Sequence, residues 1–327
     1  MSVWLDGKVV QHQEARVSPL AHTLHYGMGA FEGIRAYVAT QGPVVFRLED
    51  HLIRLERSAR ILGMCLAWNI DELVNAVLET LRSNELQEAY IRPLIYYGQG
   101  SMSLDSRTNA VHVLIAAWPW DSYHGVATDA GLAVKISSYR RIPNNCLPVQ
   151  AKAVGNYLNS QLAYREALSC GSQEAILLDD RGFIAEGSAE NVFLVRDGRL
   201  LTPTTHNALE GITRDTVIAI ATDLGLEVQE TDLVREDLYC ADEAFFTGTA
   251  CEIKKISSVD GRAIENRSDR SVVDELWQHY QSVVRGDYKL TTVSTRPRPR
   301  SWCIRVYPNS LAAPEQSPIE VAVHSSN

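Results

Sequence analysis

The chain has 327 residues, of which 45% are hydrophobic and 22% charged, a composition typical of a globular protein with one large domain or two moderate ones. Its net charge of −9 argues against nucleic acid or an anionic membrane as the main partner. Because the N-terminus lacks a signal-peptide pattern and no window approaches about eighteen apolar residues, we expect a cytoplasmic protein that does not span a membrane.

The N-terminal third is predicted to mix strands and helices. Asp6-Gly7 indicates a hairpin turn, and Asn69-x-x-Glu72 resembles a capping box that opens an amphipathic helix. The expected elements are a hairpin at 3–10, a strand at 43–48, helices at 49–62 and 69–81, and strands at 89–97 and 111–118.

The spacings of the glycines, histidines and cysteines do not match those of dinucleotide-binding or metal-binding motifs. Gly27, Gly29 and Gly33 have a spacing one residue too long for a dinucleotide-binding loop, and no apolar strand precedes them. His22 and His25 form an H-x-x-H pair outside a firm helix, which is more often structural than metal-binding. The six cysteines are scattered without a C-x-x-C pair, which favours buried thiols over disulfides or zinc ligands. We expect no metal site.

Arginines of one predicted helix and of one predicted strand could bind an anion. Arg54, Arg57 and Arg60 recur every third residue, which usually makes a solvated helix face, although one arginine near the helix start could reach an anion. Tyr90 and Arg92 share one face of a strand. That pair suits a carboxylate, and it suits a packed structural pair about equally well.

Lys152 lies near the middle of the chain among small and apolar residues. The chain has few lysines, and this one alone has no charged residue within several positions on either side. Desolvation favours the neutral amine, which is a nucleophile. The alternative is a surface lysine at a helix start. The surrounding pattern predicts a helix over 148–169 that ends near Gly171.

The remainder of the chain supplies an acid and two possible anion sites. Residues 174–187 are predicted to form a hairpin that places Glu186 at the end of an apolar strand. A glycine and a threonine open the helix predicted at 211–224, and small residues end the strand predicted at 243–250. Backbone N–H groups at such turns suit phosphate, although many helices begin this way without binding anything.

An isolated lysine, an acid at a strand end, a tyrosine five residues after the lysine and two anion sites meet the needs of pyridoxal phosphate (PLP). The chain resembles the class IV aminotransferases, and closely resembles their branched-chain amino acid aminotransferases, from about Trp4 to about Tyr288. The motifs that carry this resemblance are His25-Tyr26-Gly27, Phe31-Glu32-Gly33-Ile34-Arg35, Tyr90-Ile91-Arg92-Pro93, Ala151-Lys152-Ala153, Gly155-Asn156-Tyr157, Glu186-Gly187, Glu190-Asn191, Gly211-Ile212-Thr213-Arg214 and Gly248-Thr249-Ala250.

The resemblance implies PLP fold type IV, with two α/β domains and the cofactor between them. The small domain would span 1–122, a linker 123–131, and a large domain with a β-barrel-like core 132–288. The polar residues 121–131 are consistent with that boundary. The segment 289–327 has prolines, serines and no apolar period, so we expect a disordered tail beyond the usual end of the family.

The resemblance also implies a role for each cofactor residue. Lys152 is the Schiff-base lysine and the acid/base, Glu186 pairs with the pyridine nitrogen, and Tyr157 hydrogen-bonds the 3'-oxygen. The phosphate is implied to be held by Arg54 and by the small residues of the two anion sites, Gly211, Ile212, Thr213, Gly248 and Thr249.

On the substrate side, the resemblance implies that Tyr90 and the turn Thr249-Ala250 bind the α-carboxylate and that Arg92 meets the side-chain carboxylate of glutamate. The residues implied to line the apolar side-chain pocket are Tyr26, Phe31 and Tyr123. The implied activity is transamination between leucine, isoleucine or valine and 2-oxoglutarate, by a homodimer or a larger homo-oligomer.

Other readings stay open. A D-amino acid aminotransferase or a 4-amino-4-deoxychorismate lyase of the same fold would share Lys152 and Glu186, although Arg92 and the Phe31 pocket favour the branched-chain enzyme. A cofactor-free Schiff-base lyase would use Lys152 alone and would leave the anion sites unexplained. A non-catalytic binding protein with this fold is the third alternative.

Overall fold

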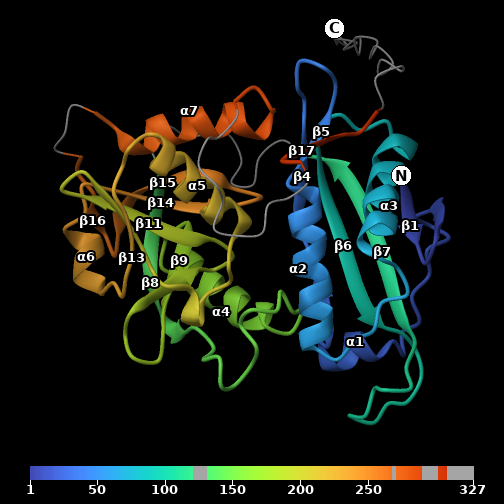
Figure 1. The fold of residues 1–327 in the computed structure, drawn as a ribbon. Coiled ribbons are helices and arrows are strands. Elements are labelled where there is room, and N and C mark those ends of the chain that lie inside the picture. Colours follow the sequence, from blue (N-terminus) through green and yellow to red (C-terminus); the bar gives the residue numbers. More distant parts are fainter. Residues whose placement is uncertain (121–130, 267–269, 289–300, 308–327) are drawn as a thin grey trace, which may run out of the picture.

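The structure is a computed structural model that describes residues 1–120, 131–266, 270–288 and 301–307. These residues form an α/β architecture with two β-sheets that lie beside one another, each covered by helices (Figure 1). Among the described residues, no helix combines the length and apolar character needed to cross a membrane.

The first sheet contains strands from both ends of the chain. Its strands are β1 (Ser2–Leu5), β2 (Lys8–Gln11), β3 (Gly29–Phe31), β4 (Ile34–Tyr37), β5 (Val44–Phe46), β6 (Ala89–Tyr97), β7 (Val111–Pro119) and β17 (Cys303–Arg305). Their order is β17-β5-β4-β6-β7-β1-β2, and β3 pairs with β6 beside this path. The predicted hairpin and the predicted strands of this part are confirmed.

Three helices accompany this sheet: α1 (His22–Tyr26), α2 (Leu48–Ile61) and α3 (Ile70–Ser83). Helices α2 and α3 lie side by side against the sheet (Figure 1) and bury Leu52, Leu55 and Leu81 in its core. The predicted capping box is confirmed, because Asn69 Oδ1 accepts the Glu72 N–H at 3.0 Å and Glu72 Oε2 accepts the Asn69 N–H at 2.7 Å.

The second sheet is built from the middle and later parts of the chain. Its strands are β8 (Leu132–Arg140), β9 (Glu174–Leu178), β10 (Ile184–Gly187), β11 (Asn191–Arg196), β12 (Arg199–Thr202), β13 (Val228–Glu230), β14 (Glu243–Gly248), β15 (Glu252–Val259) and β16 (Arg262–Ala263). Their order is β10-β9-β8-β15-β14-β11-β12-β13, and β16 pairs with β15. Its helices are α4 (Tyr157–Ser169), α5 (Ile212–Asp223), α6 (Arg235–Tyr239), α7 (Val272–Val284) and the 3₁₀ turn η1 (Thr205–Asn207).

One apolar cluster joins the two sheets. Tyr37 and Phe46 of the first sheet pack with Phe193 of the second sheet and with Tyr280 of α7. The rings of Phe46 and Tyr280 meet edge to face with centroids 6.2 Å apart. Burial of these rings stabilises the contact of β4 and β5 with α7 and the second sheet.

The helix predicted over 148–169 is wrong at its start, because α4 begins at Tyr157. Lys152 lies in the irregular segment before it. Val154 N–H donates to Gly29 O at 2.8 Å and Phe31 N–H donates to Lys152 O at 3.1 Å, so the segment runs along the edge of β3. These tertiary hydrogen bonds replace the intrahelical ones that the local pattern predicts.

The expectation of a disordered tail is wrong for residues 301–307. Strand β17 pairs antiparallel with β5, from Cys303 opposite Phe46 to Arg305 opposite Val44. Val306 is fully buried in the first core, and its carbonyl accepts the Arg82 Nε–H at 2.6 Å. Residues 289–300 and 308–327 lie outside the described part of the chain.

The cysteines only partly match the expectation of buried thiols. All six are free, but Cys65, Cys146, Cys170 and Cys240 are exposed. The expectation that these thiols are buried is therefore wrong for these four, because their burial depends on which face of each element meets the core.

Candidate active site

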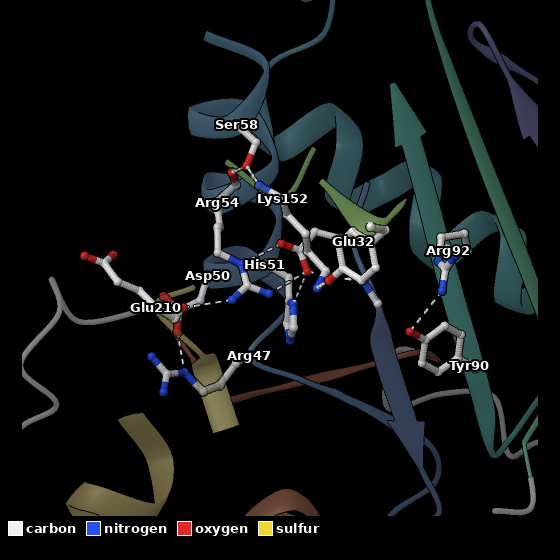
Figure 2. A network of polar contacts seen from close by, with 12 residues as sticks. Glu32, Arg47, Asp50, His51, Arg54, Ser58, Tyr90, Arg92, Lys152 and Glu210 are labelled. Atoms are coloured by element: carbon white, nitrogen blue, oxygen red, sulfur yellow. Dashed lines mark hydrogen bonds and ion pairs between the residues drawn. The ribbon is translucent and has the colours of Figure 1, made fainter. Parts of the chain in front are cut away.

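Lys152 is fixed through its main chain. Its N–H donates to Ser58 Oγ at 3.0 Å, from helix α2, and its carbonyl accepts the Phe31 N–H from β3 (Figure 2). The neighbours Ala151 and Ala153 are buried. Lys152 Nζ donates to the Tyr157 hydroxyl at 2.6 Å, so the first residue of α4 directs the amine.

Glu186 lies on β10, where the pairing with β9 shifts register between Ile184 and Glu186. Its carboxylate is 8% exposed, forms an ion pair with Arg141 Nε at 2.6 Å, and accepts the Leu209 N–H at 3.1 Å. Burial raises the pKa of Glu186, while Arg141 and the Leu209 N–H act against this rise. Glu186 is therefore a buried acid with one cation beside it, suited to hold a further N–H donor.

A cavity of about 570 Å³, part of it open to solvent, lies between Lys152 and Glu186. All nine residues that the sequence assigned to the cofactor line it or adjoin its lining: Arg54, Lys152, Tyr157, Glu186, Gly211, Ile212, Thr213, Gly248 and Thr249. Gly211 precedes the first turn of α5, whose N–H groups have no partners within the helix.

The residues of this cavity fit PLP. A Cβ on Gly211 would overlap the Asn191 side chain, so only glycine allows the backbone to approach there. Among the described residues, Thr247 Oγ1 is buried without a hydrogen-bond partner and belongs to the cavity wall. Helix N–H groups and an arginine suit a phosphate, the Glu186 carboxylate suits a ring nitrogen, and the Lys152 amine suits an aldehyde.

A second cavity shares Lys152, Tyr157 and Thr249 with the first. Of the residues expected to bind substrate, those that line it are Phe31, Tyr90, Arg92, Thr249 and Ala250. Arg92 Nη2 donates to the Tyr90 hydroxyl at 3.2 Å, and the guanidinium lies 4.7 Å from the centroid of the Phe31 ring (Figure 2). The predicted shared face of Tyr90 and Arg92 is thus confirmed, with an apolar ring beside a cation.

One expected substrate residue, Tyr26, lies away from this cavity. Tyr26 is 47% exposed and donates its hydroxyl to Met102 O at 2.8 Å, outside both cavities. Tyr123 lies outside the residues that the structure describes. The His22 ring packs against Tyr26 and contacts Ser103 O at 2.9 Å through Nε2. The described residues contain no group of three or more His, Cys, Asp or Glu arranged to hold a metal.

Sequence reasoning gave no role to Arg141, Ser58 or the carboxyl pair Glu174 and Glu190, although Glu190 belongs to one of the motifs that carry the resemblance. Arg141 follows β8 directly, and Ser58 lies one turn after Arg54 on α2. Neither has a local pattern that distinguishes it from a surface residue. Arg54 was placed on a face that is usually solvated, yet its side chain is 5% exposed, whereas Arg60 on the same helix is exposed.

Residues 29–259 match the family model described as Amino-transferase class IV. The chain belongs to this family. It is 44% identical over 285 residues to the branched-chain-amino-acid aminotransferase of Pseudomonas aeruginosa, a match that covers 87% of this chain and 93% of the relative. The resemblance to branched-chain amino acid aminotransferases is confirmed.

Solved structures agree with this assignment. The branched-chain amino acid aminotransferase of Escherichia coli superposes with a TM-score of 0.88 at 41% identity, covering 94% of this chain and 99% of that one. A second branched-chain amino acid aminotransferase, solved in complex with N-(5'-phosphopyridoxyl)-L-glutamate, has a TM-score of 0.86 at 41% identity and covers 94% and 98%. The α/β fold of type IV is confirmed, and members of this family use PLP.

The structural match also corrects the expected end of the family. A match confined to residues 1–288 would cover 288 of 327 residues, about 88%, less than the 94% covered by the Escherichia coli enzyme. The similarity therefore continues into the C-terminal segment, in agreement with the buried position of Val306.

Proposed function

We propose that this class IV aminotransferase exchanges an amino group between L-leucine, L-isoleucine or L-valine and 2-oxoglutarate, giving branched-chain 2-oxo acids and L-glutamate. The observation that carries the proposal is a single cavity lined by Lys152, Glu186 and Arg54, adjoined by a substrate cavity that contains Arg92. PLP supplies the electron sink when it is bound.

Each residue of the first cavity has a proposed task. Lys152 attaches the cofactor, and its amine moves the proton removed from the substrate α-carbon. Tyr157, 2.6 Å from that amine, orients it and donates toward the 3'-oxygen. Glu186 remains ionised beside Arg141 and holds the proton of the pyridine nitrogen. Arg54 and the N-terminus of α5 neutralise the phosphate.

The second cavity accounts for two unlike substrates. Phe31 and Tyr90 provide an apolar wall for a branched side chain. Arg92 pairs a glutamate carboxylate in the same space, and its buried Nε has no hydrogen-bond partner among the described residues. One cation at an apolar wall binds the acid without making the whole pocket polar. Thr249 and Ala250 would bind the α-carboxylate together with Tyr90.

We propose further that the chain acts in the cytoplasm as a homodimer or a larger homo-oligomer, with a small domain at 1–122, a linker at 123–131 and a large domain at 132–288. The names of the relatives, the α/β fold and the acidic net charge are compatible with these assignments. Analytical ultracentrifugation of the purified protein tests the oligomer, and a monomer would contradict it.

The purified protein's absorbance spectrum tests the function. We expect a visible band from lysine-bound PLP that is lost on addition of L-leucine and restored by 2-oxoglutarate. Lys152→Ala removes the lysine-bound band and the transamination, whereas the exposed-lysine variant Lys8→Ala retains both. Faster reaction with D-alanine than with L-leucine, or unchanged transamination in Lys152→Ala, would contradict the proposal.

A further inference from the structure

Glu32 is a completely buried carboxylate next to the site, to which the proposed chemistry assigns no task. Its Oε1 accepts Arg54 Nε–H at 2.6 Å, and its Oε2 accepts Arg54 Nη2–H at 2.9 Å. His51 Nδ1 lies 2.7 Å from the same Oε2. Figure 2 shows Glu32 between Arg54 and His51, with all three side chains converging.

The charge state of this cluster is set by its own members. Burial opposes ionisation of Glu32, but Arg54 and His51 outweigh it and hold the pKa of this carboxyl well below its usual range. Burial lowers the pKa of His51, so at neutral pH the imidazole is neutral and donates through Nδ1–H. Glu32 is therefore an anion that accepts hydrogen bonds from Arg54, from a neutral histidine and, at 3.3 Å, from the Gly33 N–H.

The contacts of Arg54 fix the direction of its guanidinium. Of its five N–H groups, Glu32 accepts two and the Glu210 carbonyl accepts one, at 2.9 Å from Nη1. Within the described residues, two N–H groups remain without a partner, on a side chain that lines the cofactor cavity. Because the guanidinium is planar and the Glu32 carboxylate binds two of its N–H groups, the remaining N–H groups point in one fixed direction.

The same short piece of chain also fixes Lys152. Phe31, the residue before Glu32, donates its N–H to Lys152 O. Ser58 on α2 accepts the Lys152 N–H at 3.0 Å and donates its hydroxyl to Arg54 O at 2.8 Å. The lysine main chain and the arginine are thus tied to the same strand and the same helix.

We propose that Glu32 is a positioning residue, which holds Arg54 ready for the cofactor phosphate at a set distance from the lysine that attaches the aldehyde end. A preorganised guanidinium loses little freedom when the phosphate binds, so its orientation contributes to affinity. This inference rests on the proposed role of Arg54 in the cofactor site.

Pyridoxal, which lacks the phosphate, provides the test. Apoprotein of each variant is titrated with PLP and with pyridoxal, and the dissociation constants are read from the absorbance of the lysine-bound form. We expect Glu32→Gln to weaken PLP binding about tenfold or more and to leave pyridoxal binding within about threefold. The matched control is Glu243→Gln, which alters a buried carboxylate that accepts bonds from Ser271 and Val272, away from the cavity. It should change neither constant.

Two further variants separate the inference from the function on which it rests. Arg54→Gln should weaken PLP but not pyridoxal; if it weakens neither, the proposed role of Arg54 fails. If Arg54→Gln behaves as expected, Glu32→Gln added to it should cause little further loss, because Glu32 acts through Arg54. Additive losses, or an equal loss for both ligands in Glu32→Gln, would show a merely structural carboxylate and overturn the inference.

Glu32→Asp covers the case in which Glu32→Gln does not fold. It retains the charge but is one methylene shorter, so the carboxylate no longer reaches both Arg54 nitrogens. We expect a smaller loss of PLP affinity than for Glu32→Gln, again with pyridoxal binding unchanged. Wild-type PLP affinity in Glu32→Asp would contradict the inference.

Discussion

Arg141 Nε lies 2.6 Å from Glu186 Oε1, and the two side chains are 7% and 8% exposed. Both charges are therefore almost completely removed from water. Burial raises the pKa of Glu186 and Arg141 opposes the rise, so this arginine favours the ionised form of the acid.

Glu186→Ala should reduce kcat/KM by about 100-fold or more, the usual cost of removing one aligned electrostatic group. Glu186 would hold the proton of the ring nitrogen, so its removal should weaken the electron sink that PLP would supply. PLP should still be bound, because Lys152, Arg54 and the N-terminus of α5 are unchanged. Steady-state kinetics with L-leucine and the absorbance of the purified variant measure the two effects. Full activity would contradict the role of Glu186.

Arg141→Gln should shift the acid limb of the activity profile to higher pH. Removal of the cation raises the pKa of Glu186 further, so the carboxylate becomes protonated, and the enzyme loses rate, at a higher pH than in the wild type. The profile of kcat/KM against pH measures this shift. Arg181→Gln, which removes a half-exposed arginine paired with the buried Asp179, is the control, and a shift of equal size in it would contradict a specific effect of Arg141.

Arg92→Gln should separate the two substrate classes. The variant removes the charge that would pair a glutamate carboxylate, so KM for L-glutamate should rise about tenfold or more, as expected for a lost hydrogen bond to a charged group. KM for L-leucine should change by less than about threefold, because Phe31 and Tyr90 still form the apolar wall. Arg107→Gln, on an 86% exposed side chain, serves as the control. Equal increases for both substrates would contradict the assignment.

The sequence predicted those site residues whose chemical role requires an unusual local sequence. Lys152 stood out because no charged residue lies near it in the chain, and Glu186 because a strand end placed an acid against small residues. Gly211 and Gly248 indicated turns whose backbone N–H groups are accessible to an anion. These residues lie at the ends of elements, and the elements themselves follow from apolar periodicity.

What the sequence missed depends on long-range partners. Arg141 has the local surroundings of a surface arginine, and only β10 beside it makes it part of the site. The start of α4 was predicted too early because the hydrogen bond between Lys152 and Phe31 joins residues 121 positions apart. The C-terminal segment is polar and proline-rich, yet β5 offers an unpaired edge that three of its residues complete.

Glu174→Gln should make stability less sensitive to pH between about 4.5 and 7. Glu174 and Glu190 are both buried, and burial raises the pKa of Glu174 to about 7. An acid with a raised pKa in the folded state contributes its full stability below its unfolded value, near 4.5, and loses it as pH rises through about 7. The wild type should therefore lose at most about 3.5 kcal/mol over these 2.5 pH units, at about 1.4 kcal/mol per unit.

Urea unfolding at pH 5, 7 and 9 checks this expectation. In Glu174→Gln the free energy of unfolding should fall less between pH 5 and 9 than in the wild type, because the amide stays neutral and can still accept the Ala175 N–H. Glu265→Gln, at an exposed position, should follow the wild type. The same slope in Glu174→Gln as in the wild type would show that this carboxyl is not protonated in the folded protein.

Val306→Ala should destabilise the fold although it lies near the end of the described chain. Val306 is fully buried among the residues that pack between α3 and the first sheet, and removal of two buried methyl groups costs about 2 kcal/mol. The loss should exceed that of Val38→Ala, a side chain that is 46% exposed. Because the ring of Trp302, just before β17, lies 4.8 Å from the Arg47 guanidinium, the effect should reach the junction between the sheets. Thermal unfolding of both variants measures it, and equal stability would mean that the C-terminal segment is not held on β5 in solution.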